Sequence, residues 1–186
     1  VDNTVDERQN GNKNSKAGVI TPYGSSSECV VDSNRLYNAE GIMLYTCGKS
    51  TAFTANYFTE VRRNRLDGRT AGPGAYGGIF LWYGAEANKP SHVLGYGTVI
   101  AGNTITDCDY NGKGAISLYP CWSKPTTPVQ WKEALIFGNT ITGLPEGIHI
   151  HESYAWYTVI GPNTLQDVAT PVVDRGTGTV RMGTGN

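Results

Sequence analysis

The chain has almost no net charge, and it has no long hydrophobic run. Its 186 residues include 15 basic and 16 acidic side chains, which leaves a net charge of −1 at pH 7. Without an excess of one sign, no electrostatic field favours nucleic acid or an anionic membrane as a partner. No apolar run approaches the ~18 residues of a membrane-spanning helix. We therefore expect neither a nucleic-acid partner nor a membrane span.

Helical patterning is also missing. No window shows apolar residues recurring with a 3.6-residue period, so the sequence does not predict a helical fold. The four cysteines form no zinc-type pairs, and there is no nucleophile elbow. We therefore expect no metal ion and no cofactor.

A repeated phrase dominates the sequence instead. The residues VIAGNTIT at 99–106 recur as LIFGNTIT at 135–142. Looser copies lie at 30–36, 61–66 and 159–165, and the chain opens on a half copy, Asn3-Thr4-Val5. A repeat of this size indicates one structural unit stacked on itself.

Each copy of the phrase is followed by a second apolar segment, in most copies led by glycine. These segments are 18–21, 41–44, 78–81, 114–118, 147–150 and, weakest of the set, 171–174. Their apolar residues are mostly β-branched and fall at alternate positions, which is the period of a strand. The repeat therefore predicts strand, Asn turn, strand, variable loop, Gly-led strand and variable loop.

The asparagine of the phrase recurs six times, at intervals of 24 to 39 residues. Asparagine tolerates the left-handed backbone region and bonds locally, so we expect it at a tight turn. If the turns stack, the side-chain amides can also hydrogen-bond from one repeat to the next as a ladder.

With these motifs the chain resembles the right-handed parallel β-helix proteins of the pectate-lyase-like superfamily, over roughly its whole length. The resemblance implies an all-β solenoid of about six coils forming a single domain over residues 1–186. The chain begins inside a repeat, without a capping helix. We therefore expect a piece of a larger protein, with another chain or a further N-terminal segment covering the open end, unless residues 6–17 cover it themselves.

The register of the Gly-led strands predicts which residues point outward. If the residue after glycine points inward, alternate residues form two outward columns. One column is Ile20, Met43, Phe80, Ser117, His149 and Val173, and the other is Tyr45, Trp82, Tyr119 and His151. Aromatic side chains in a line suit sugar rings, so we predict that Tyr45, Trp82 and the nearby Trp122 bind substrate. Alternatively, loops 83–98 and 119–133 fold back and bury such rings, including Trp131 and Trp156, as a satellite core.

His149 and His151 are the candidate catalytic residues. Both are predicted to point outward, and Glu146 and Glu152 flank them. They can serve as general base or acid with a carboxylate partner, for which we choose Glu152 or Asp109, while Tyr119 assists proton transfer or stacks. The other readings are two metal ligands or a plain polar surface.

Two further groups of charged residues have alternative explanations. Asp107 and Asp109, with Glu152 or Glu86, can supply the paired carboxylates of a glycoside hydrolase, or they are ordinary turn residues. The arginines near the Asn64 turn can recognise an acidic polysaccharide, which makes Arg69 a binding candidate, or they form a solvated edge. This group is Arg62, Arg63, Arg65 and Arg69.

The four cysteines allow two states. Either Cys29–Cys47 and Cys108–Cys121 are two local disulfides of a secreted protein, or all four are thiols.

The resemblance implies handling of polysaccharides outside the cell or at its surface, although the signature elements of polygalacturonases are absent. We expect an enzyme that cleaves a polysaccharide by hydrolysis, transfer or β-elimination. The alternative is a structural or sugar-binding β-helix, such as an adhesin or a tailspike-like stalk.

Overall fold

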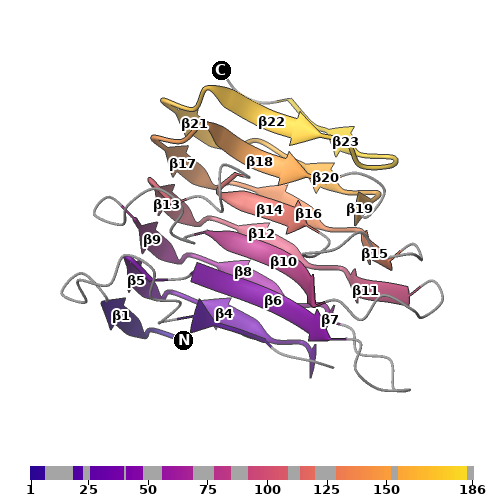
Figure 1. Cartoon of the computed structure of the whole chain (residues 1–186), viewed down its shortest axis with the longest axis horizontal. Coiled ribbons are helices and arrows are strands. Elements are labelled where there is room, and N and C mark those ends of the chain that lie inside the picture. The colour runs from indigo at the N-terminus through magenta and orange to yellow at the C-terminus, as the bar shows by residue number, and fades with distance from the viewer. Residues whose placement is uncertain are drawn as a thin grey trace.

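The structure is a computed structural model that describes residues 1–6, 19–22, 26–39, 41–47, 56–68, 78–84, 92–108, 114–119, 129–151 and 155–183. All the regular elements in these ranges are strands, and they form four parallel sheets. The chain runs through the sheets in turn and returns to each one a coil higher, as the stacked layers of Figure 1 show.

Three of the sheets contain the predicted strands. The Gly-led sheet is β2 (Val19–Ile20), β6 (Gly41–Cys47), β10 (Ile79–Gly84), β14 (Ile116–Tyr119), β18 (Glu146–Ile150) and β22 (Thr170–Asp174). The pre-Asn sheet is β4 (Val30–Asp32), β8 (Glu60–Arg62), β12 (Val99–Ala101), β16 (Leu135–Phe137), β20 (Val159–Ile160) and β23 (Val180–Arg181). The post-Asn sheet is β1 (Thr4–Asp6), β5 (Arg35–Tyr37), β9 (Arg65–Asp67), β13 (Thr104–Thr106), β17 (Thr140–Thr142) and β21 (Thr164–Gln166). Only β23 was not predicted, and six strands in each sheet confirm the parallel β-helix and its six coils.

The fourth sheet was not predicted. It consists of β3 (Ser26–Ser27), β7 (Asn56–Tyr57), β11 (His92–Tyr96), β15 (Val129–Lys132) and β19 (Ala155–Trp156). These residues were predicted to lie in variable loops, which is wrong. These strands are short, and their inward column mixes Asn56, Gly95 and Trp131, so no apolar alternation marks them in the sequence.

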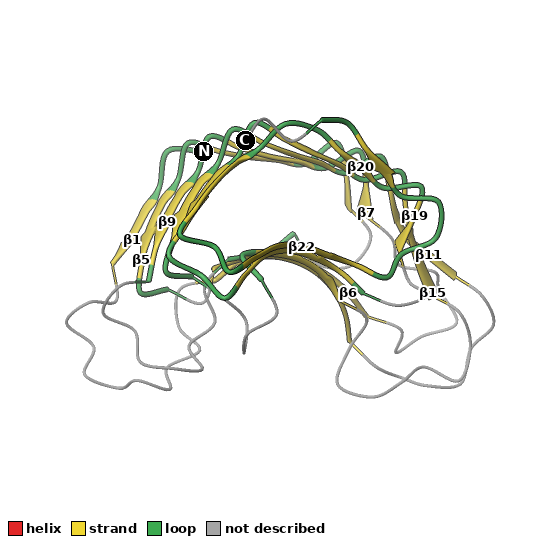
Figure 2. Ribbon diagram, turned by 90° about the horizontal axis from the view of Figure 1, so that it is seen from above, coloured by secondary structure: helices red, strands yellow, loops and turns green. Residues whose placement is uncertain are grey.

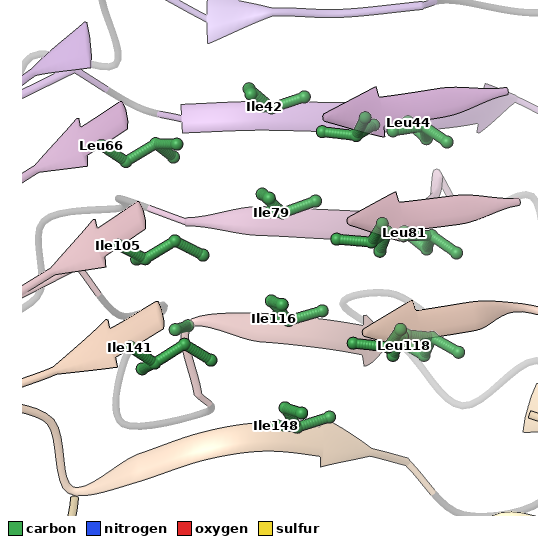
Figure 3. Close-up of a cluster of buried hydrophobic side chains, with 14 of the residues drawn as sticks. Ile42, Leu44, Leu66, Ile79, Leu81, Ile105, Ile116, Leu118, Ile141 and Ile148 are labelled. Carbon is green, nitrogen blue, oxygen red and sulfur yellow. The ribbon is translucent and has the colours of Figure 1, made fainter. Parts of the chain in front are cut away.

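Stacked aliphatic side chains fill the interior of the coils (Figure 3). In the Gly-led sheet the inward positions are fully buried, as predicted: Ile42, Leu44, Ile79, Leu81, Ile116, Leu118, Ile148 and Ile150. Each such side chain contributes about 1.5–3 kcal/mol relative to exposure. One predicted register is wrong: Val19 pairs with Gly41, so Ile20 pairs with Ile42 and does not belong to the outward column.

The predicted asparagine ladder is confirmed. From Asn34 onward, the side-chain oxygen of each ladder Asn accepts hydrogen bonds from the backbone N–H and the amide of the Asn one coil earlier, as in the Asn64–Asn103 pair at 3.0 and 2.9 Å. The asparagines themselves do not adopt the left-handed conformation. In five coils the preceding residue does: Asp2, Ser33, Arg63, Gly102 and Gly138. The left-handed residue makes the turn, and this leaves the Asn side chain pointing inward.

Neither predicted disulfide forms, because Cys29 and Cys108 are both thiols. The Cys108 thiol donates a hydrogen bond to the carbonyl oxygen of Thr106, 3.1 Å away. Each predicted bond would need one of these two residues.

Candidate functional site

The candidate site lies on the outer face of the Gly-led sheet. Backbone pairing aligns Met43, Phe80, Ser117, His149 and Val173, which confirms the rest of the first predicted column. Figure 2 shows that this sheet, seen at β6 and β22, arches toward the interior of the coil, so its outer surface is concave.

The second column is also aligned. Trp82 pairs with Tyr45 and with Tyr119. The backbone N–H of His151 donates to the carbonyl of Leu118 at 3.1 Å, which places His151 beside Tyr119. The side chains of Tyr45, Trp82 and Tyr119 lie outside the described part of the structure, so their predicted contact with substrate stays a prediction.

One residue extends this column beyond the prediction. The backbone N–H of Arg175 donates to the carbonyl of Ile150 at 2.9 Å, so Arg175 lies beside His151 in the next coil. Its side chain is exposed. The predicted column ended at His151, so Arg175 was not among the candidate residues. Carrying the register one coil further would have found this arginine.

His149 is held by a carboxylate. Its Nδ1 lies 2.7 Å from Oε2 of Glu146, and the imidazole is 10% exposed. Its other nitrogen, Nε2, is buried and has no hydrogen-bond partner. Glu146 was predicted only to flank the histidines, and Glu152 or Asp109 was the predicted carboxylate partner. The described carboxylate in contact with His149 is Glu146.

The two predicted catalytic histidines do come together. The rings of His149 and His151 are stacked, with centroids 5.6 Å apart and an angle of 18° between planes. Because the two residues alternate along one strand, both rings lie on the same face of the sheet. Within the described ranges, no cluster of three His, Cys, Asp or Glu residues is placed to hold a metal ion.

The first column is more enclosed than the sequence suggests. Phe80 and Ser117 point away from the interior yet are 0% exposed, and His149 is 8% exposed. Phe80 is therefore not an exposed binding ring in this structure. The sequence predicts no role for Ser117 in this column; its hydroxyl is buried with no hydrogen-bond partner, in register with His149.

Several predicted site residues are not tested. Glu152, Asp109, Trp122 and Arg69 lie outside the described residues. Asp107 is described and is an exposed turn residue with a left-handed backbone.

Trp131 is not a binding residue, because it is buried inside the coil at 1% exposure. It belongs to β15 of the fourth sheet and packs within the hydrophobic core.

The arginines near Asn64 make ion pairs within the protein. Arg63 and Arg62 both bind the carboxylate of Asp32, Arg62 through its Nε at 3.2 Å. Arg62 also contacts Glu60 at 2.7 Å. The hydrogen bonds from Arg63 hold the pKa of Asp32 well below its usual range. Arg62 and Arg63 therefore stabilise the Asn64 turn through ion pairs within the protein. They lie far in the sequence from His149 and His151.

In the described ranges, no helix is long and apolar enough to cross a membrane. No protein-family model, no curated protein and no solved structure matches this chain.

Proposed function

We propose that this chain is a carbohydrate-active β-helix protein of the pectate-lyase-like superfamily that cleaves glycosidic bonds of a polysaccharide on the outer face of the Gly-led sheet. The observation that carries the proposal is the contact between Glu146 and His149 at 2.7 Å. With such a substrate, the protein would work in a secreted form or at the cell surface.

The contact with Glu146 determines which ring nitrogen of His149 carries the proton. An ionised carboxylate can only accept hydrogen bonds, so Nδ1 carries the proton that faces Glu146. In the neutral ring Nε2 then holds the lone pair, and it is the atom that can take a proton from a substrate. Nε2 has no hydrogen-bond partner in the described part of the structure, but it is buried, so a substrate would have to displace the groups that cover it.

Arg175 favours β-elimination among the possible cleavage reactions. Removing the proton next to a sugar carboxylate needs a base and a positive group that stabilises the resulting anion. Arg175 and His151 are neighbours in one column, and His151 is stacked on His149. Two-carboxylate hydrolysis needs a second acid, and on this face the described residues supply Glu146 alone, already engaged by His149.

A non-catalytic β-helix is the second candidate, and the burial of Phe80 and Ser117 favours it. A column packed this closely can be structural, with Glu146–His149 as a buried polar pair. In that case the chain would present a rigid surface without turning over a glycan.

Incubation with polygalacturonate, alginate and xylan separates the two candidates. Absorbance of unsaturated uronates reports elimination, and new reducing ends report any cleavage. We expect elimination on a uronate polymer, lowered about 10²–10⁴-fold by His149→Ala. His92→Ala, on β11 of the fourth sheet, is the matched control and should keep the wild-type rate. Cleavage of none of these polymers, or full activity of His149→Ala, would rule the proposal out.

A further inference from the structure

A second surface, on a different side of the coil, carries a line of aromatic rings. The outward positions of the fourth sheet stack in register as Ser27, Tyr57, Tyr96, Lys132, Trp156 and Thr177. The next residue in each coil is left-handed: Glu28, Phe58, Gly97, Glu133, Tyr157 and Gly178. We call these two columns the ridge. Figure 2 shows β7, β11, β15 and β19 apart from β6 and β22.

Four ridge residues other than glycine adopt the left-handed conformation, and two of them, Phe58 and Tyr157, carry bulky aromatic side chains. Phe58 has φ of 50° and Tyr157 has φ of 57°. A bulky residue is strained there, whereas glycine is not, and the equivalent positions in neighbouring coils are Gly97 and Gly178. Strain of this kind clusters at functional sites. Aromatic rings at these positions therefore need a reason beyond the turn.

The rings are supported from one side and open on the other. A Cβ added to Gly97 would lie 2.7 Å from Cδ1 of Phe58, and one added to Gly178 would lie 2.8 Å from Cδ1 of Tyr157. Each ring thus lies against a glycine of the next coil. Both side chains nevertheless remain 54% exposed. The glycines hold the rings in fixed positions and leave the rest of their surface to solvent.

The two rings belong to two aromatic pairs with matching geometry. Phe58 meets Tyr96 edge to face at 5.7 Å and 87°, and Trp156 meets Tyr157 at 6.3 Å and 88°. Phe58 and Tyr157 are three coils apart, or roughly 14 Å at the usual strand spacing. The ridge therefore offers two aromatic platforms along the axis of the β-helix.

Polar groups lie between the platforms. Glu133 accepts a hydrogen bond from the Tyr96 hydroxyl, which raises the pKa of Tyr96. Lys132 places its Nζ 5.5 Å from the centroid of the Trp156 ring. Across its two columns the ridge carries two carboxylates, Glu28 and Glu133, against one ammonium group, so its charge does not suit a polyanion.

We propose that the ridge binds a neutral polysaccharide chain laid along the axis of the β-helix. Sugar rings would stack on the two platforms, and their hydroxyls would bond to Glu133 and Lys132. A linear ligand fits because the apolar surface is a narrow line interrupted by charges, unlike the compact apolar centre of a protein interface. This site is separate from the histidines and would hold the protein on a neutral glycan, whatever the histidines do.

Native gel electrophoresis in hydroxyethylcellulose, galactomannan or xylan tests the proposal, with polygalacturonate as the polyanion. The test variant is Phe58→Asn with Tyr157→Asn, because asparagine tolerates the left-handed conformation and should not harm folding. The control is Phe137→Asn on β16, which is 40% exposed but lies off the ridge. We expect retardation by at least one neutral glycan, weakened at least about tenfold in the double variant alone.

Two results with the wild type would overturn the proposal: no neutral glycan retards the protein, or polygalacturonate is the only polymer that retards it. Two results with the double variant would also overturn it. Either the double variant is retarded as strongly as the wild type, or the wild type is a dimer and the double variant is a monomer. The last result would make the ridge a protein interface. His149→Ala should keep its retardation, so failure at the histidine site and failure at the ridge are distinguishable.

Discussion

The side-chain amide of Asn103 donates a hydrogen bond to Oδ1 of Asn139, 2.9 Å away, and both side chains are buried. The same contact links Asn34 to Asn64 and Asn139 to Asn163. The ladder therefore ties each coil to the next at the turn between the pre-Asn and post-Asn sheets.

Replacing Asn103 by alanine should lower the free energy of unfolding by about 3 kcal/mol. The side-chain oxygen of Asn103 accepts from both the backbone N–H and the amide of Asn64, and its amide also donates to the carbonyl of Val61 at 2.9 Å. Alanine leaves these buried groups without partners. Urea denaturation measures the loss. Asn3→Ala, at the exposed first rung, should cost less than about 1 kcal/mol, and equal costs would contradict the ladder as a source of stability.

Gly95→Ala should also destabilise the protein, by about 1–3 kcal/mol or more. A Cβ at this position would lie 2.0 Å from Cζ3 of Trp131, whose ring lies across the glycine. Shortening the partner relieves the clash. In a double-mutant cycle with Trp131→Leu, the Gly95→Ala cost should therefore fall, and strict additivity of the two substitutions would show that the clash is not the cause.

Asp32→Asn should destabilise the protein at neutral pH and lose that effect in acid. The hydrogen bonds from Arg63 lower the folded-state pKa of Asp32, so the ionised carboxylate stabilises the fold above the unfolded-state pKa of about 4. The stabilisation declines as the pH falls below that value toward the lowered pKa. Urea midpoints of both proteins between pH 7 and pH 3 should converge. Asp167→Asn, at an exposed turn, should show no such convergence.

Glu146→Gln should lower the rate of glycan cleavage by about 10²-fold or more while leaving the urea midpoint nearly unchanged. Glutamine can offer either an oxygen or an NH₂ group to Nδ1, so it no longer enforces the proton position on His149. Rates on the cleaved polymer and unfolding curves are measured side by side. A loss of stability in proportion to the loss of rate would indicate that the pair is structural.

Arg175→Gln should reduce kcat on a uronate polymer by about 10²-fold, because the anion formed after proton removal loses its positive neighbour. Arg181→Gln is the control, since Arg181 lies on β23 of the pre-Asn sheet and contacts Asp174 at 3.5 Å. If the two variants have equal rates, Arg175 has no part in the reaction.

Much of the coil could be predicted because the direction of each strand side chain depends on residues within the same short segment. Ile105 and Ile141 alternate with threonines, so their inward direction follows from the strand period alone. The turn could be predicted because asparagine suits a tight turn and its side chain hydrogen-bonds locally. The same register placed His149 and His151 on one face, which the stacked rings confirm.

The errors arose where a residue's environment depends on the coils beside it. Trp131 is the large member of a column whose neighbours are Gly95 and Ala155, and only the stacking shows that the two small residues make room for it. Phe80 points outward and is still buried. Glu146 became the partner of His149 because the start of β18 brings its carboxylate to Nδ1, a contact that sequence distance did not favour over Glu152.

The sequence by itself determined the strands of three sheets, the six coils and the asparagine ladder, because each depends on side-chain alternation and turn chemistry within one short segment. Only the tertiary structure decided which residues become neighbours across coils. Contacts such as Arg175 beside His151, or the Phe58 ring on Gly97, join residues that hydrogen bonding between strands brings together from distant parts of the chain. Loops of unequal length separate these residues in sequence, so their juxtaposition exists only once the coils are stacked.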